Sequence, residues 1–83
     1  MTVRAYILIE CEATRAGAVS AGLKNLAVSH AKVLSADTAS GPFDVIALLE
    51  SPDLDGLGRA VTEGIQRISG VLRTVTCVVL ELA

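Results

Sequence analysis

The sequence predicts an α+β domain in which two helices cover one face of a four-stranded antiparallel sheet. Two observations predict it. Stretches of alternating apolar residues, typical of strands, are separated by two stretches whose apolar residues recur every three or four positions, as in helices. The two halves of the chain also resemble each other, because Leu8-Ile9-Glu10 precedes the first helical stretch and Leu48-Leu49-Glu50 precedes the second.

The first half is predicted to form a strand, a helix and a strand. Residues Val3 to Cys11 alternate between the two faces of a strand, and both faces are partly apolar. The apolar spacing becomes helical from Arg15 to Ala27. Strand character returns from Val28 to Thr38, and this second strand leads into the turn Ser40-Gly41-Pro42-Phe43.

The second half repeats this order. A third strand is expected from Phe43 to Glu50. Ser51 is expected to cap the second helix, with Pro52 at its first helical position, because a serine oxygen accepts a first-turn amide and proline has no amide hydrogen to leave unpaired there. The helix is expected to stop at Gly70, and the last strand to run from Val71 to Leu82.

Strand, helix, strand, strand, helix and strand in this order predict a ferredoxin-like topology, in which the first and third strands are central. Both helices then cover one face of the sheet. The other face is expected to carry Tyr6, Leu8, Ile46 and Leu48, a larger apolar patch than a soluble monomer usually exposes. We therefore expect at least a homodimer, packed sheet against sheet as a dimeric α/β-barrel.

Length and composition indicate a single domain over residues 1–83. A chain of 83 residues has a thin core, yet 52% of its residues are hydrophobic and its mean hydropathy is +0.59, which also favours subunit association. No apolar run approaches the roughly 20 residues of a membrane-spanning helix, and the first residues lack the layout of a signal peptide. Cys11 and Cys77 are expected to be reduced core thiols of a cytoplasmic protein.

The charge distribution argues against direct contact with nucleic acid. The net charge is −2, the pI is about 5.2, and the 7 basic residues are scattered along the chain. RNA-recognition modules share the predicted order of elements, but they stack bases on aromatic residues of their central strands. Here the third strand begins Phe43-Asp44-Val45-Ile46-Ala47, which is acidic and aliphatic.

No pattern of catalytic or metal-binding residues stands out, so an enzyme is not expected. The one histidine, His30, is expected to be an ordinary polar residue of the second strand. The serines lack the sequence context of known nucleophiles, and the glycines form no phosphate-binding loop. No spacing suggests three converging metal ligands, and no cofactor is expected.

Asp44 is the most informative single residue, because a charge at the mouth of an apolar strand must reach water or find a partner. It is interpreted either as a turn carboxylate that accepts backbone amides around Gly41, or as a carboxylate that receives a ligand's ammonium group or a neighbouring subunit's donor. Thr74 and Thr76 favour the second interpretation, since residues two apart on a strand face the same side. Threonine is also simply common in sheets.

Two segments resemble the ligand-binding domain of the Lrp/AsnC family, also called the RAM or AsnC-type effector domain. Gly41-Pro42-Phe43-Asp44-Val45 matches the family's Gly-x-[Tyr/Phe]-Asp followed by an aliphatic strand, and Ile68 to Thr76 is similar to the stretch that runs from the second helix into the last strand. The resemblance extends from Val3 to Leu82. Family members usually carry an N-terminal helix-turn-helix domain, so this chain, which begins at the first strand, resembles a stand-alone form.

The resemblance implies sheet-to-sheet homodimers that assemble into rings, commonly octamers, with amino acids or similar effectors bound between dimers. It implies a role in transcription regulation, exerted through co-assembly with full-length regulators. The residues implied to bind the effector are Ser40, Gly41, Phe43, Asp44, Thr74 and Thr76. Asp44 would receive the ammonium group, while hydroxyls and turn amides hold the carboxylate. The alternatives are a small dimeric α/β-barrel enzyme of the monooxygenase type and a purely structural assembly domain.

Overall fold

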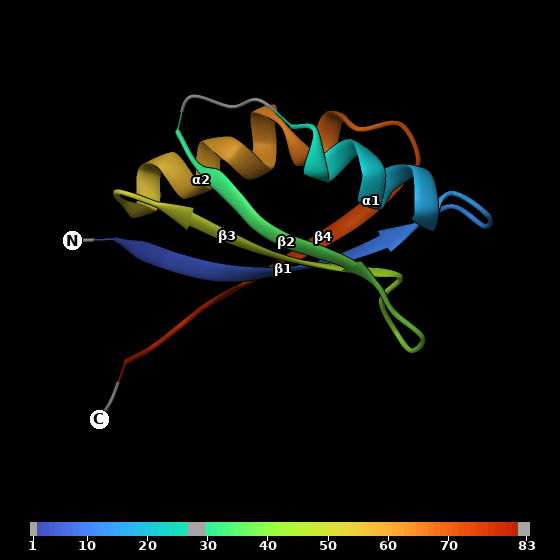
Figure 1. Ribbon diagram of the computed structural model, residues 1–83, viewed down its shortest axis with the longest axis horizontal. Coiled ribbons are helices and arrows are strands. Elements are labelled where there is room, and N and C mark those ends of the chain that lie inside the picture. Colours follow the sequence, from blue (N-terminus) through green and yellow to red (C-terminus); the bar gives the residue numbers. More distant parts are fainter. Residues whose placement is uncertain (1, 27–29, 82–83) are drawn as a thin grey trace.

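The computed structural model describes residues 2–26 and 30–81 and shows one four-stranded antiparallel sheet with both helices on one face (Figure 1). The strand order is β2-β3-β1-β4, so the first and third strands are central, as the sequence predicts. The ferredoxin-like topology is thereby confirmed. The elements in chain order are β1 (Val3–Cys11), α1 (Ala16–Lys24), β2 (Lys32–Thr38), β3 (Val45–Ser51), α2 (Leu54–Glu63), the 3-10 helix η1 (Ile65–Arg67) and β4 (Val71–Val78).

The first helix is shorter than predicted. It ends at Lys24, where Asn25 closes the last turn by donating from both its backbone N and its side-chain Nδ2 to the Ala21 carbonyl. The predicted end at Ala27 lies outside the described residues, as do the first two residues of the predicted second strand. His30 was wrongly placed in a strand: β2 begins at Lys32.

The start of the second helix was predicted two residues too early. Ser51 is the last residue of β3, paired with Val3, and its hydroxyl donates to the His30 carbonyl at 2.7 Å. The cap is Asp53, whose backbone is extended and whose carboxylate accepts from the Gly56 amide at 2.7 Å. Pro52 therefore precedes the helix rather than opening it.

The second helix also ends earlier than expected, and Gly70 has a different role. The α-helix stops at Glu63, and η1 follows it. Gly70 then turns the chain into β4 with φ +102°, and a Cβ on this residue would lie 2.9 Å from the Cβ of Arg15. Glycine is needed here both for its backbone angle and for the close approach of Arg15.

The last strand pairs with β1 only as far as Val78. The Val79 amide donates to the Arg4 carbonyl at 2.8 Å, and the chain then leaves the sheet on the side away from the helices (Figure 1). The predicted strand end at Leu82 lies outside the described residues.

The core lies between the sheet and the helices. The central strands direct a set of completely buried side chains toward the helices: Ala5, Ile7, Ile9, Val45, Ala47 and Leu49. Val19 and Leu23 of α1, Leu57 of α2 and Ile65 of η1 close this layer from above. Full burial of one such aliphatic side chain contributes about 1.5–3 kcal/mol, so this layer is the main stabilising element of the fold.

The opposite face of the sheet has no cover among the described residues, and we call it the open face. It carries Tyr6, Leu8, Ile46 and Leu48, as predicted, in directly facing pairs. On the β4 side the register adds Val75 beside Leu8 and Cys77 beside Tyr6. Cys77 is exposed, so its assignment as a core thiol was wrong: β4 turns this side chain away from the helices. Cys11 is buried, and both thiols are free.

Candidate functional site

The turn between β2 and β3 positions the residues around Asp44. The Ala39 amide donates to the Asp44 carbonyl and closes the loop, while the Asp44 amide donates to the Ile9 carbonyl of β1, both at 2.8 Å. Gly41 has φ +146°, an angle that other residues rarely adopt, and Ser40 and Gly41 are exposed. The turn is therefore fixed at its base and open at its tip.

The Asp44 carboxylate is half-buried and lies against the end of β1. Its Oδ2 accepts from the Cys11 backbone amide at 2.8 Å. This amide belongs to the neighbouring strand, not to the turn around Gly41 as one interpretation of the sequence expected. Among the described residues Oδ1 has no protein donor, so one oxygen is held while the other is available to a ligand.

The Asp44 carboxylate affects the pKa of the nearby Cys11 thiol. Burial, and secondly the negative charge of Asp44, raise the pKa of the Cys11 thiol above its ordinary value. The thiol therefore stays protonated at neutral pH, which excludes it as a nucleophile there.

Phe43 links this turn to β4. The Arg73 guanidinium carbon lies 5.3 Å from the centroid of the Phe43 ring, within the range of a cation–π contact. On its other side Arg73 approaches Glu10, with 3.6 Å between Nη2 and Oε2. Both side chains of this ion pair are largely exposed, so the contact is a weak one.

Thr74 and Thr76 share one side of β4, as expected, but it is the side that faces the helices. They pair with Ile9 and Ile7, whose side chains belong to the core. The Thr74 hydroxyl oxygen accepts from Gln66 Nε2 at 3.0 Å, whereas Thr76 is exposed. β1 separates both threonines from Asp44, so one subunit does not bring all the predicted residues together.

Three hollows mark the surface of the described part of the chain. One, of about 380 Å³, lies at the outer edge of β4 and is lined by Gln66, Val71, Leu72, Arg73 and Thr74. A second, of about 370 Å³, is lined by both chain ends and Leu54. The monooxygenase alternative calls for a cavity between sheet and helices, and none of these three lies there.

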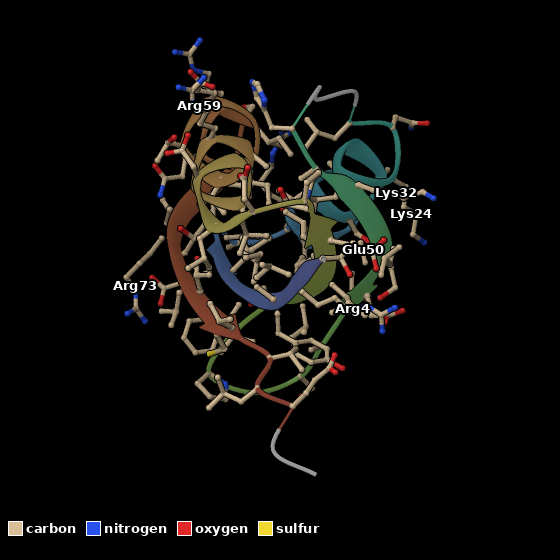
Figure 2. The ribbon with its side chains drawn as sticks, turned by 90° about the vertical axis from the view of Figure 1, so that its left-hand side faces the viewer. Arg4, Lys24, Lys32, Glu50, Arg59 and Arg73 are labelled. Atoms are coloured by element: carbon tan, nitrogen blue, oxygen red, sulfur yellow. The ribbon has the colours of Figure 1, made fainter. Side chains whose placement is uncertain are left out.

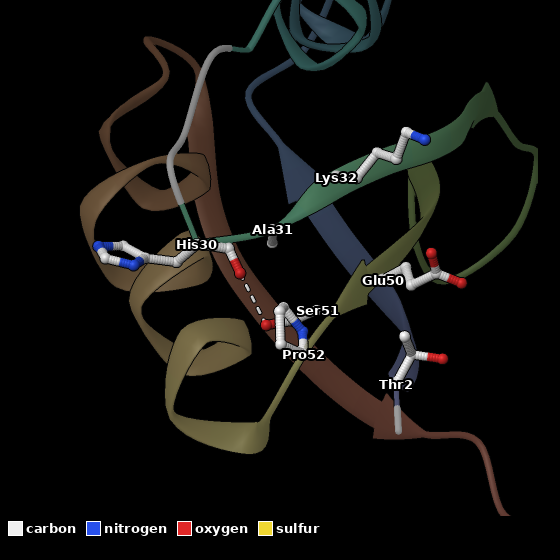
Figure 3. Close-up of a pocket in the computed structure, with 7 residues that line it drawn as sticks. All are labelled: Thr2, His30, Ala31, Lys32, Glu50, Ser51 and Pro52. Atoms are coloured by element: carbon white, nitrogen blue, oxygen red, sulfur yellow. Dashed lines mark hydrogen bonds between the residues drawn. The ribbon is translucent and has the colours of Figure 1, made fainter.

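The third hollow, of about 240 Å³, is lined by the residues drawn in Figure 3. These lie at the start of β1 and the end of β3, the opposite end of the sheet from Asp44. Figure 3 shows the His30 side chain pointing away from those of Lys32 and Glu50, which are paired across β2 and β3 and extend toward the same side. Such divergence does not hold a ligand from several sides. Over residues 2–26 and 30–81 no three His, Cys, Asp or Glu residues are grouped to hold a metal ion, and no helix there is long and apolar enough to cross a membrane.

Sequence reasoning missed three contributors: Arg73, Gln66 and Cys11. Arg73 could have been found, because it directly precedes Thr74 on the last strand. In the structure it is paired with Glu10 of β1. The contacts of Gln66 and Cys11 depend on how η1 and the 40–44 turn pack against the sheet, and no local pattern signals them.

Comparisons with known proteins place this geometry in context. A family model described as "Lrp/AsnC ligand binding domain" matches residues 4–82. TTHA0845 from Thermus thermophilus is similar in structure, with a TM-score of 0.84 and 27% sequence identity over 98% of this chain and 96% of that chain. A search of curated proteins gives no match.

Two longer proteins share the fold. AsnC of E. coli has a TM-score of 0.81 and 22% identity over 95% of this chain and 51% of that chain. The transcriptional regulator NMB0573 from Neisseria meningitidis, solved as a complex with L-Met, has a TM-score of 0.77 and 20% identity over 96% of this chain and 51% of that chain. The present chain therefore corresponds to about half of each of these proteins.

Proposed function

Because this chain belongs to the Lrp/AsnC ligand binding domain family, we propose that it binds an amino acid and forms homo-oligomers as an effector-sensing module of transcription regulation. Its role is binding rather than catalysis, in the cytoplasm. The proposed assembly is a sheet-to-sheet dimer that forms larger rings, with an octamer as the expected size. Contact with DNA would come through co-assembly with a full-length regulator.

The observation that carries the amino-acid proposal is the state of Asp44. Its carboxylate is half-buried and fixed through Oδ2 to the Cys11 amide, while Oδ1 has no donor among the described residues. A fixed anion with one available oxygen suits a compact cation that donates hydrogen bonds, such as the ammonium group of an amino acid. The L-Met complex of NMB0573, which has the same fold, supports the choice of ligand class.

The rest of the proposed site comes from the turn and from β4. Ser40 and Gly41 provide exposed donors at the tip of the turn, and Phe43 provides an apolar wall. Thr74 and Thr76 lie beyond β1, so in this proposal they belong to a neighbouring subunit that packs against the turn. An effector at such a contact favours the oligomer that contains the complete site.

A thermal-shift screen of the twenty amino acids tests this proposal. At least one amino acid should raise the melting temperature of the wild-type protein, since a ligand that binds only the folded state stabilises it. Asp44→Asn should abolish the shift, because it removes the charge that holds the ammonium group while the amide oxygen still accepts from Cys11. Asp55→Asn, on an exposed carboxylate of α2, is the matched control and should respond as the wild type does.

If no amino acid shifts the melting temperature at millimolar concentration, the amino-acid proposal is wrong. An equal shift in wild type and Asp44→Asn would keep the ligand class and remove Asp44 from the site.

A further inference from the structure

Two turns meet at the end of the sheet where β1 ends and β4 begins. The first turn, residues 12–15, leads from β1 into α1, and the second turn, residues 68–70, leads from η1 into β4. A backbone hydrogen bond joins them, from the Glu12 amide to the Gly70 carbonyl at 2.8 Å. The Arg15 amide donates to the Glu12 carbonyl at 3.0 Å, so the backbone of Arg15 is fixed beside the second turn.

Ser69 of the second turn is exposed and lies against the Arg15 guanidinium. Arg15 Nη2 donates to the Ser69 hydroxyl oxygen at 3.3 Å and to the Ser69 carbonyl oxygen at 3.5 Å. Gly70 permits this approach, because a Cβ on that residue would lie 3.1 Å from Arg15 Nε as well as 2.9 Å from its Cβ. An accessible hydroxyl is therefore placed next to a positive charge.

The uncharged hydroxyl uses only part of the hydrogen-bonding capacity of Arg15. Both contacts are longer than the usual N–H···O range of about 2.7–3.2 Å. A guanidinium presents several N–H donors in a planar fork, which matches the oxygens of a phosphoryl group. Arg67, directly before the second turn, adds another positive charge, and Glu12 is the one acidic residue of the two turns. The charges here favour an anionic group on Ser69.

We propose that Ser69 is a phosphorylation site and that Arg15 holds its phosphoryl group. In the reaction Ser69 Oγ attacks the γ-phosphorus of ATP, the new O–P bond replaces the bond to the departing ADP, and the hydroxyl proton passes to a base of the kinase. The enzyme is a protein serine kinase that selects a basic residue shortly before its acceptor, because Arg67 is exposed and lies two residues before Ser69. This inference goes beyond the proposed function and does not depend on it.

Phosphorylation strengthens the connection between the start of α1 and the start of β4. A phosphoryl group carries a charge of about −1.5 to −2 at pH 7 and offers strong acceptor oxygens, so it forms charge-assisted hydrogen bonds with a neighbouring arginine. These bonds replace the two long contacts of the hydroxyl and carbonyl oxygens with Arg15. The modification therefore stabilises the folded chain.

Incubation of the folded protein with ATP and the catalytic subunit of cAMP-dependent protein kinase tests the acceptor. This kinase serves as the probe because it selects basic residues before its serine. Intact-mass spectrometry should show one added phosphoryl group, and fragmentation should locate it on Ser69. Ser69→Ala should abolish the uptake, and Arg67→Gln should slow it. Ser40→Ala, on an exposed serine of the β2–β3 turn, is the matched control and should be phosphorylated as the wild type is.

Phosphoserine incorporated at position 69 during synthesis tests the role of Arg15 without a kinase. Urea unfolding should show a folded-to-unfolded ratio about threefold to tenfold higher for the phosphorylated protein, as expected for a charge-assisted contact at an exposed site. Arg15→Gln should remove most of this gain, because glutamine keeps a donor but not the charge. Arg59→Gln, on a 54% exposed arginine of α2, is the matched control and should keep the gain.

Each part of the inference can fail by itself. If the folded wild-type protein takes up no phosphoryl group, or takes it up only on another serine, Ser69 is not the acceptor. If phosphoserine at position 69 adds no stability, or adds the same stability to the wild type and to Arg15→Gln, Arg15 does not hold the phosphoryl group. Neither failure affects the proposed function, which the amino-acid screen tests separately.

Discussion

Asp44 and Cys11 form an electrostatic pair at the end of β1, joined by the hydrogen bond from the Cys11 amide to the carboxylate. The same carboxylate is proposed to hold the effector's ammonium group. Neutralising its charge with a bound cation therefore also changes the field at the buried thiol. A single residue thus links the proposed ligand to the interior of the sheet.

The raised pKa of the Cys11 thiol predicts a loss of stability at alkaline pH. The unfolded chain loses this proton near the ordinary value of 9.0, while the folded chain, whose thiol has the higher pKa, retains it. The free energy of unfolding should therefore be unaffected by this group below 9.0 and should fall as the pH rises above it toward the folded-state pKa. Urea unfolding under reducing conditions, from pH 7 upward, measures this decline in the free energy of unfolding.

Cys11→Ala should flatten this alkaline decline, although it also lowers the overall stability by removing a buried side chain. Cys77→Ala, on the exposed thiol, should leave the decline in place. Identical pH profiles for wild type and Cys11→Ala would show that the buried thiol is not its source.

Among the helices and strands, the start of α2 shows how one contact decides a boundary. Ser51 and Asp53 are both good capping residues by type. Pairing with Val3 and the hydrogen bond to the His30 carbonyl hold Ser51 in β3, so Asp53 becomes the first residue free to cap the helix. The tertiary contact therefore overrides the local preference.

Asp53→Ala should lower the free energy of unfolding by about 1 kcal/mol, because the Gly56 amide loses its acceptor. Asp55→Ala should cost only a few tenths of a kcal/mol, since that carboxylate is 83% exposed and Arg59 is its one ion-pair partner within residues 2–26 and 30–81. Denaturant unfolding of the two variants compares them. Equal losses would mean that Asp53 is not the helix cap.

For the molecule as a whole, the open face is the surface through which we propose that the chain associates. Its apolar centre, around Tyr6, Leu8, Ile46 and Leu48, is flanked by ion pairs at both ends: Arg4 with Glu50 at 2.9 Å, and Arg73 with Glu10. Figure 2 shows Arg4 and Glu50 together at the right of the view and Arg73 at the left. An apolar centre with charged ends is suited to bury against a second copy.

Tyr6→Lys should lower the mass of the protein in solution from that of its oligomer toward the monomer mass of 8.6 kDa. Tyr6 is 46% exposed, so a lysine there costs the isolated subunit little but would bury a charge in a sheet-to-sheet contact. Leu54→Lys, on a 60% exposed leucine of α2, is the control and should leave the mass unchanged. Static light scattering measures the mass of each protein in solution. A wild-type monomer, or an oligomer that tolerates Tyr6→Lys, would contradict association through the open face.

The order of elements, the two central strands and the open face could all be predicted from the sequence. These features follow from local periodicity: alternation from Val3 to Cys11 fixes which side chains meet the helices, and the repeated strand–helix order leaves few topologies. The same alternation correctly placed Thr74 and Thr76 on one side of a strand. Asp44 was singled out because it is a charge directly after a turn and at the start of an apolar strand.

The partners across the sheet, in contrast, emerge only from the folded chain. That Asp44 accepts from Cys11, that Arg73 stacks on Phe43, and that β1 separates Asp44 from Thr74 all depend on strand order and register. No local pattern encodes these contacts, because each joins residues far apart in the chain. They separate the candidate residues into two groups, one at the β2–β3 turn and one on β4.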